Sequence, residues 1–172
     1  MLFRSSDVGL VYYSGHGVEA KGVNYLIPVN ANIRREYELT GGAYPASQIT
    51  GMMEEIQASG DRKRVAILIL DACRDNPLTR SWRSSGGGLA RMDAPAGTFI
   101  SFATAPGSVA SDGSGRNSPF TKHFLQAMKK PNQPIELMFK EIRVGVVQDT
   151  KGEQVPWESS SLMGDFYFNK TK

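Results

Sequence analysis

The chain has 172 residues, of which 40% are apolar, and a formal net charge of +3. This length suits one domain with a sizeable core, and the single cysteine excludes an intrachain disulfide or a metal site built from several cysteines. Basic residues are scattered apart from positions 62–64, which we interpret as a solvated loop. No wide basic face and no apolar run of about 18 residues is present, so we expect neither a nucleic-acid nor a membrane partner. The first residues lack a signal-peptide core, and the lone cysteine suits a reducing compartment, so the expectation is a cytoplasmic location.

Two apolar runs predict the central strands. Residues 7–13 form the first run, and Ser14-Gly15-His16-Gly17 follows it at once. Glycines on both sides of His16 indicate a sharp turn with unshielded amides; a hairpin turn carrying an incidental histidine is the alternative.

The second run, residues 65–70, is six apolar residues long and predicts a strand buried on both faces, as in a parallel sheet. Cys73 lies just past its end. Because ligands bind beyond the carboxyl ends of parallel strands, neighbouring strands here would bring His16 and Cys73 to one edge of the sheet.

The remaining segments alternate between strand and helix. We expect a strand in 22–30 stopped by Pro28, a surface loop over 31–44, a flexible loop over 78–96 and a strand over 97–104. The tail over 157–168 is expected to form a closing strand around residues 164–168. Three helices are expected. The first spans 45–59, with Ser47 as its cap and Ile49, Met52, Met53 and Ile56 facing inward. The second begins at Ser118-Pro119, with Phe120, Phe124, Leu125 and Met128 facing inward, and the third spans 134–149, with Ile135, Met138, Phe139, Ile142 and Val146 facing inward. We interpret His123 as a solvated residue. The pattern predicts a single α/β domain over residues 1–172, a three-layer sandwich with a mostly parallel central sheet.

A thiol and an imidazole at one sheet edge indicate nucleophilic catalysis. A free cysteine titrates at about 8.5, so it needs a base near neutral pH, and His16 could take the proton of Cys73. The amides of Gly17 and Cys73 could hold an oxyanion. Asp71 and Asp75 flank the thiol, and at least one should face away from it. Asp71 at the floor of a pocket would attract a cationic side chain; the alternative is a strand-end carboxylate that accepts backbone hydrogen bonds.

These motifs resemble a known family. Tyr-Tyr-Ser-Gly-His-Gly, Asn-Tyr-Leu-Ile-Pro-Val and Leu-Asp-Ala-Cys-Arg-Asp are similar to motifs of caspase-like cysteine peptidases, and closest to bacterial relatives of metacaspases and paracaspases. His16 precedes Cys73 by 57 residues (73 − 16), near the spacing of about 50 in caspases. Ala-Cys-Arg matches the caspase signature, whereas Asp71 and Asp75 replace its glutamine and glycine.

The resemblance implies roles for individual residues. His16 would be the general base and acid, Cys73 the nucleophile, and the amides of Gly17 and Cys73 the oxyanion donors. Ser14 and Asp71 would line a pocket for arginine or lysine, and the stretch that begins with Ala103 and Thr104 would bind the substrate backbone. The expected partner is therefore a protein or peptide with a basic residue. Some relatives need calcium, but no acidic cluster typical of a calcium loop is visible, so we expect no cofactor and no metal.

The chain departs from the family pattern at its amino-terminal end. The family fold begins with two more strands before the histidine strand, whereas only residues 1–6 precede it here. We therefore expect a catalytic domain truncated at this end, with an open strand edge that an amino-terminal complementing segment or a second copy could cover. Two alternatives to the endopeptidase are a non-catalytic caspase-like scaffold and an α/β hydrolase or transferase for a non-peptide acyl substrate.

Overall fold

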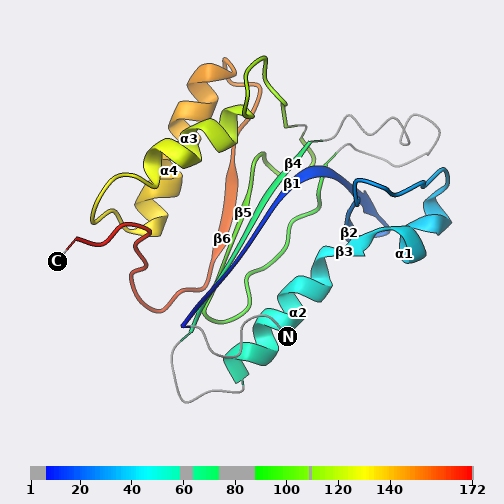
Figure 1. Ribbon diagram of the computed structural model, residues 1–172, viewed down its shortest axis with the longest axis horizontal. Helices are drawn as coiled ribbons and strands as arrows, with labels where there is room; N and C mark the ends of the chain where they lie inside the picture. The colour runs from blue at the N-terminus through cyan, green and yellow to red at the C-terminus, as the bar shows by residue number, and fades with distance from the viewer. Residues whose placement is uncertain (1–6, 59–63, 74–87, 109, 172) are drawn as a thin grey trace.

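The protein is built around one mixed β-sheet with helices on both faces (Figure 1). The computed structural model describes residues 7–58, 64–73, 88–108 and 110–171, without the side chains of Ile56 and Cys73. Within these ranges the strands are β1 Val8–Ala20, β2 Val23–Leu26, β3 Tyr44–Pro45, β4 Val65–Cys73, β5 Thr98–Phe102 and β6 Trp157–Ser160. The helices are η1 Glu36–Glu38, α1 Leu39–Gly42, α2 Ala46–Ala58, α3 Pro119–Ala127 and α4 Ile135–Asp149. No helix in the described ranges is long and apolar enough to cross a membrane.

The sheet is parallel at its centre and antiparallel toward its edges. The strand order is β3-β2-β1-β4-β5-β6. β4 pairs in parallel with both β1 and β5, whereas β2, β3 and β6 join by antiparallel pairing. The α/β prediction is confirmed, but a mostly parallel sheet is correct only for the three central strands. For β2 the reason is connectivity, because a tight turn joins it to β1 and thereby forces antiparallel pairing.

Two apolar layers sandwich the sheet, as the sequence predicts. α2 covers one face, and α3 and α4 cover the other (Figure 1). The layer beneath α2 contains Leu68, Leu70 and Ile100. The opposite layer contains Ile67, Ile69 and Phe99 together with the five predicted α4 residues, all of which are buried. The alternation within β4 therefore supplies both layers, as expected for a strand buried on both faces.

β1 is longer than the sequence predicts. Extended structure continues through Ser14-Gly15-His16-Gly17, where we expected a turn, and ends only at Ala20. The turn lies at Lys21-Gly22, whose φ angles are 52° and 79°. Positive φ at both central residues defines a two-residue hairpin turn whose twist suits the flanking strands. β1 thus pairs with β4 as far as His16 and with β2 from Gly17 onward.

Several predicted boundaries and orientations are wrong. The predicted loop 31–44 contains η1 and α1, and it buries Ile33 and Leu39 in a small cluster under β1. α2 begins at Ala46, so Ser47 lies in its first turn instead of capping it. Met52 and Leu125 are exposed because their helices contact the sheet over a narrower stripe than the sequence suggests.

A closing strand does lie in the predicted tail 157–168, but at Trp157–Ser160 instead of around residues 164–168. The strand that pairs with β5 is β6, which is more polar, whereas the later aromatic segment makes one isolated bridge, from Tyr167 to Pro134. Phe168 packs edge-on against Phe124 of α3, with the ring centroids 5.7 Å apart. The aromatic residues therefore hold a loop against α3 and α4, although their pattern is typical of a strand.

His123 is not the solvated residue that the sequence predicts. Its side chain is 19% exposed, and its Nε2 lies 2.9 Å from Oδ2 of Asp149 at the end of α4. Hydrogen bonds from Lys122 and His123 hold the pKa of the Asp149 carboxyl below its usual range. The imidazole rests on Gly145, where an added Cβ would lie 2.5 Å from Cε1 of His123. The glycine therefore lets α3 approach α4 closely.

Gly145→Ala should destabilise the protein despite the higher helix propensity of alanine. The propensity gain is about 1 kcal/mol, whereas overpacking typically costs about 1–3 kcal/mol. In a His123→Ala background the same substitution should become stabilising, because the ring is gone. Denaturant unfolding of the parent protein, the two single variants and the double variant would measure this coupling. Additive changes in the free energy of unfolding would contradict the contact.

Within the described part of the chain, β1 has one unpaired edge. No described residue pairs with the outer edge of Val8–Ser14, because β2 reaches only Gly17–Ala20. Val8, Leu10 and Tyr12 are about two-fifths exposed on the face that carries α3. An exposed apolar edge strand promotes association. A complementing segment or a second copy that covers this edge stays a prediction.

Leu10→Lys should reduce concentration-dependent association, because charged residues protect edge strands from pairing. Leu137→Lys, at a similarly exposed leucine on the outside of α4, is the matched control. Light scattering coupled to size-exclusion chromatography would give the mass at several concentrations. A parent protein that stays monomeric throughout would remove the basis of this prediction.

Candidate active site

The parallel register of β1 and β4 brings the two candidate catalytic residues together. His16 and Cys73 are Cα partners in the last registered pair, and Ser14 and Asp71 are partners two residues earlier. β4 ends at Cys73, whereas β1 continues. Both residues thus lie within strands instead of beyond them, but still at the carboxyl edge of the parallel pair. The distance between sulfur and imidazole lies outside the described side chains.

The glycines around His16 serve close packing and not a sharp turn. A Cβ at Gly15 would lie 2.7 Å from the hydroxyl of Tyr13, and one at Gly17 would lie 3.0 Å from Leu89 and 3.1 Å from Ala72. Neither glycine has a positive φ. The motif is therefore an extended segment that needs small residues on the side facing α2.

Tyr13 braces the backbone of the histidine. Its hydroxyl lies 2.7 Å from the carbonyl oxygen of His16 and 2.9 Å from that of Ile27, and it can donate to one of them at a time. The amide of Ile27 also donates to the His16 carbonyl, at 2.9 Å. Burial raises the pKa of Tyr13, so the hydroxyl remains a donor at neutral pH.

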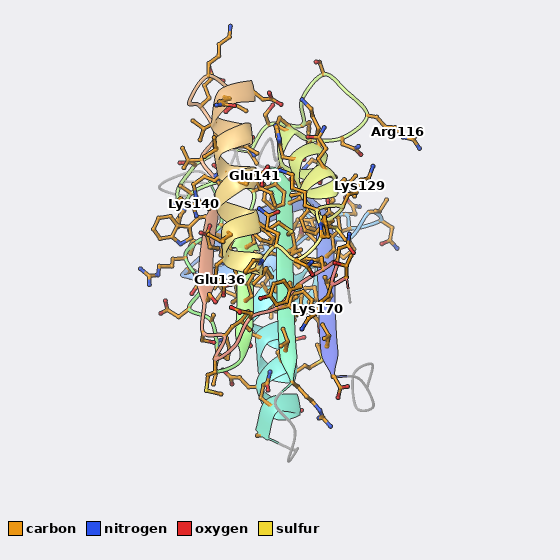
Figure 2. All side chains as sticks on the ribbon, turned by 90° about the vertical axis from the view of Figure 1, so that its left-hand side faces the viewer. Arg116, Lys129, Glu136, Lys140, Glu141 and Lys170 are labelled. Atoms are coloured by element: carbon orange, nitrogen blue, oxygen red, sulfur yellow. The ribbon has the colours of Figure 1, made fainter. Side chains whose placement is uncertain are left out.

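A pocket of about 640 Å³ lies beside His16. Its walls come from β1, from Asp71 of β4 and from the loop before α3, and they comprise Tyr12, Ser14, Gly15, His16, Asp71, Asp112, Gly113, Gly115, Arg116, Asn117, Ser118 and Thr121. Three predicted site residues, Ser14, His16 and Asp71, therefore share one pocket. Arg116 extends away from the body of the molecule (Figure 2).

Asp71 contributes a buried carboxyl group to the lining of this pocket. The residue is 2% exposed, and its Oδ2 accepts hydrogen bonds from the hydroxyls of Ser118, at 2.6 Å, and Thr121, at 2.5 Å. The alternative role predicted for Asp71, a strand-end carboxylate, would use backbone amides as donors, whereas the observed donors are hydroxyls at the start of α3. Ser118 also caps this helix by accepting from the Thr121 amide at 3.0 Å.

The hydrogen-bonding capacity of the Asp71 carboxyl group is only partly used. Its Oδ1 is buried without a hydrogen-bond partner, and no ion pair to Asp71 occurs among the described residues. Tyr12 adds a hydroxyl 2.5 Å from Thr121 Oγ1, and burial is the main cause that raises the pKa of Tyr12. A buried carboxyl group with an unpartnered oxygen is costly, so this side chain calls for an explanation beyond its two hydroxyl donors.

The backbone orientation at the strand ends bears on the predicted oxyanion donors. The amide of Ile27 reaches the His16 carbonyl from the β2 side, and the amide of Val65 donates to the Asp7 carbonyl across β1 and β4. Peptide groups alternate along a strand, so the amides of Gly17 and Cys73 both point into the gap between β1 and β4. The β1–β4 register runs through the His16–Cys73 pair, and a parallel ladder itself uses the amides that face the partner strand. Oxyanion binding by these two amides therefore stays a prediction.

The predicted substrate-backbone residues follow β5. Both backbone groups of Ala103 are engaged, since its amide donates to Leu70 at 2.9 Å and its carbonyl accepts from Gln154 at 2.8 Å. Thr104 is 8% exposed, and its Oγ1 has no hydrogen-bond partner in the described structure. Binding by Ala103 and Thr104 stays a prediction, and pairing would have to begin after Ala103.

Part of the predicted flexible loop 78–96 is anchored. The described residues 88–96 include Leu89, which is buried over Gly17 and Ala72. Buried Asn24 accepts from the Ala90 amide and donates to its carbonyl, at 2.6 and 2.8 Å. Flexibility is therefore wrong for this portion, because a pair of hydrogen bonds ties it to β2. Asp75 and residues 78–87 lie outside the described residues.

The described residues contain no group of three or more histidines, cysteines or carboxylates that could hold a metal. Tyr12, Tyr13, Thr121 and Gln154, which contact the predicted site residues, were not predicted from the sequence. Ser118 and Thr121 carried a helix-cap signal, but nothing local linked them to Asp71, which is 47 residues earlier than Ser118.

Comparison with known families identifies the class. The family model described as Caspase domain, peptidase family C14, matches residues 3–167. The chain therefore belongs to the caspase domain family of cysteine peptidases, as the paired histidine and cysteine motifs suggest. A comparison with curated proteins found no match.

Proposed function

We propose that this protein is a cysteine endopeptidase in which His16 and Cys73 form the catalytic dyad. The observation that carries the proposal is the register of β1 and β4, which pairs these two residues at the carboxyl edge of the sheet beside a pocket. Family membership supports the same class of activity. The scaffold alternative and the non-peptide acyl alternative have no observation in their favour.

In the proposed mechanism, His16 takes the thiol proton of Cys73, and the thiolate attacks the peptide carbonyl carbon. The amides of Gly17 and Cys73 stabilise the resulting oxyanion. His16 then gives its proton to the leaving amine as the carbon–nitrogen bond breaks, which leaves an acyl group on Cys73. Water deprotonated by His16 attacks this thioester, releases the carboxylic acid and restores the thiol.

The substrate residue before the cleaved bond is arginine or lysine in this proposal. Asp71 supports the assignment, since it lines the pocket that also contains His16, its Oδ1 has no hydrogen-bond partner, and no cation pairs with it among the described residues. Ser14 adds a hydroxyl to the same pocket. A guanidinium or ammonium group would supply the missing hydrogen bonds and the countercharge.

Cys73→Ala and His16→Ala should each abolish cleavage of a fluorogenic peptide with arginine before the reporter group. The expected loss is at least about a thousandfold, as is usual when a member of a nucleophile–base pair is removed. His123→Ala, which changes the chain's other histidine, is the control and should keep its activity if it folds. Full cleavage by Cys73→Ala would rule out this mechanism.

Asp71→Asn should lower kcat/KM for arginine and lysine peptides by about a hundredfold, since truncating one partner of a buried charge pair typically costs a few kcal/mol. Peptides with glutamine or norleucine at the same position should be affected much less. Asp112→Asn, at an exposed carboxylate on the rim of the same pocket, is the matched control. An equal loss for basic and neutral peptides would contradict the pocket assignment.

A further inference from the structure

The loop at residues 110–118 separates two cavities. One is the candidate substrate pocket, and the other, of about 990 Å³, lies between this loop and the turn after α4. Asp112, Gly113, Gly115 and Asn117 line both. The loop is therefore a thin wall, and any shift of the wall changes the shape of the pocket beside His16.

Two buried polar side chains hold the ends of this wall. Asp71 binds Ser118 at one end, as described above. Gln154 binds the other end, since its Oε1 accepts from the Ser111 amide at 2.9 Å. Residues 112–117 between these anchors are exposed and include two glycines, so little else in the described structure limits their movement.

Gln154 connects the wall to two firmly packed elements. Its Nε2 donates to the carbonyl of Ala103 at the end of β5, at 2.8 Å. Its own amide donates to Thr150 Oγ1 at 3.1 Å, and that hydroxyl lies 2.7 Å from the Val146 carbonyl in the last turn of α4. The residue is only 1% exposed, and a buried amide that lacked these partners would be costly.

We propose that Gln154 is a positioning residue that holds the wall of the substrate pocket through the Ser111 amide. The inference rests on the proposed peptidase function and adds a residue that acts on substrate affinity without touching the reacting atoms. Loss of the side-chain amide should loosen residues 111–117 and raise KM, whereas kcat should change little because the β1–β4 register remains.

The test replaces Gln154 by leucine, which has a similar size but neither hydrogen bond. Hydrogen–deuterium exchange of residues 111–117 should become about fivefold to tenfold faster, as expected for a lost hydrogen bond of ordinary strength. Exchange in β4 and β5 should not change. For the arginine peptide, KM should rise by a similar factor. Gln148→Leu, at an exposed position of α4, is the matched control.

A second variant guards against failure of Gln154→Leu to fold. Gln154→Glu keeps an acceptor for the Ser111 amide but loses the donor to Ala103, so its loop should exchange more slowly than in the leucine variant. Unchanged loop exchange in Gln154→Leu would overturn the proposal, and so would loss of protection throughout the sheet in both variants. If the parent protein cleaves no peptide, the peptidase function fails, but loop exchange still decides the role of Gln154.

Discussion

The parallel pairing of β1 with β4 is the constraint on which the candidate site depends. A slip of one residue would move every side chain of a strand to the opposite face, so the pairs Ser14–Asp71 and His16–Cys73 exist only in the observed register. The apolar alternation of β4 fixes that register, since Ile67 and Ile69 pack beneath α3 and α4, while Leu68 and Leu70 pack beneath α2. The core therefore determines the geometry of the polar residues that follow it.

The pocket also depends on where α3 begins. Ser118 caps the helix and donates to Asp71 at the same time, so helix formation and the pocket floor share one hydroxyl. Neutral hydroxyl donors, unlike a lysine or arginine, solvate the carboxylate without cancelling its charge. The arrangement leaves Asp71 as a buried, partly unsatisfied group among the described residues. Such groups are rare in folded proteins, and the proposed role in binding a basic substrate side chain would account for this one.

Local patterns predicted the parts of this structure that depend on neighbouring residues. The apolar run of β4, the five buried residues of α4 and the Ser118 cap all follow from sequence periodicity or cap chemistry. The length of β1 could not be predicted, because its glycines suggest a turn and only packing against Leu89 and Tyr13 explains them. His123 and Gln154 could not be placed either, since their partners are 26 and 43 or more residues away.

Tyr12 links the open edge of the sheet to the pocket. Its side chain is 39% exposed on the unpaired half of β1, and its ring stacks on Phe124 of α3 with the centroids 6.2 Å apart. Its hydroxyl lies against Thr121, which in turn donates to Asp71. Among the described residues, Tyr12 and Thr121 therefore connect the unpaired edge of β1 to the carboxyl group of Asp71 by direct contacts.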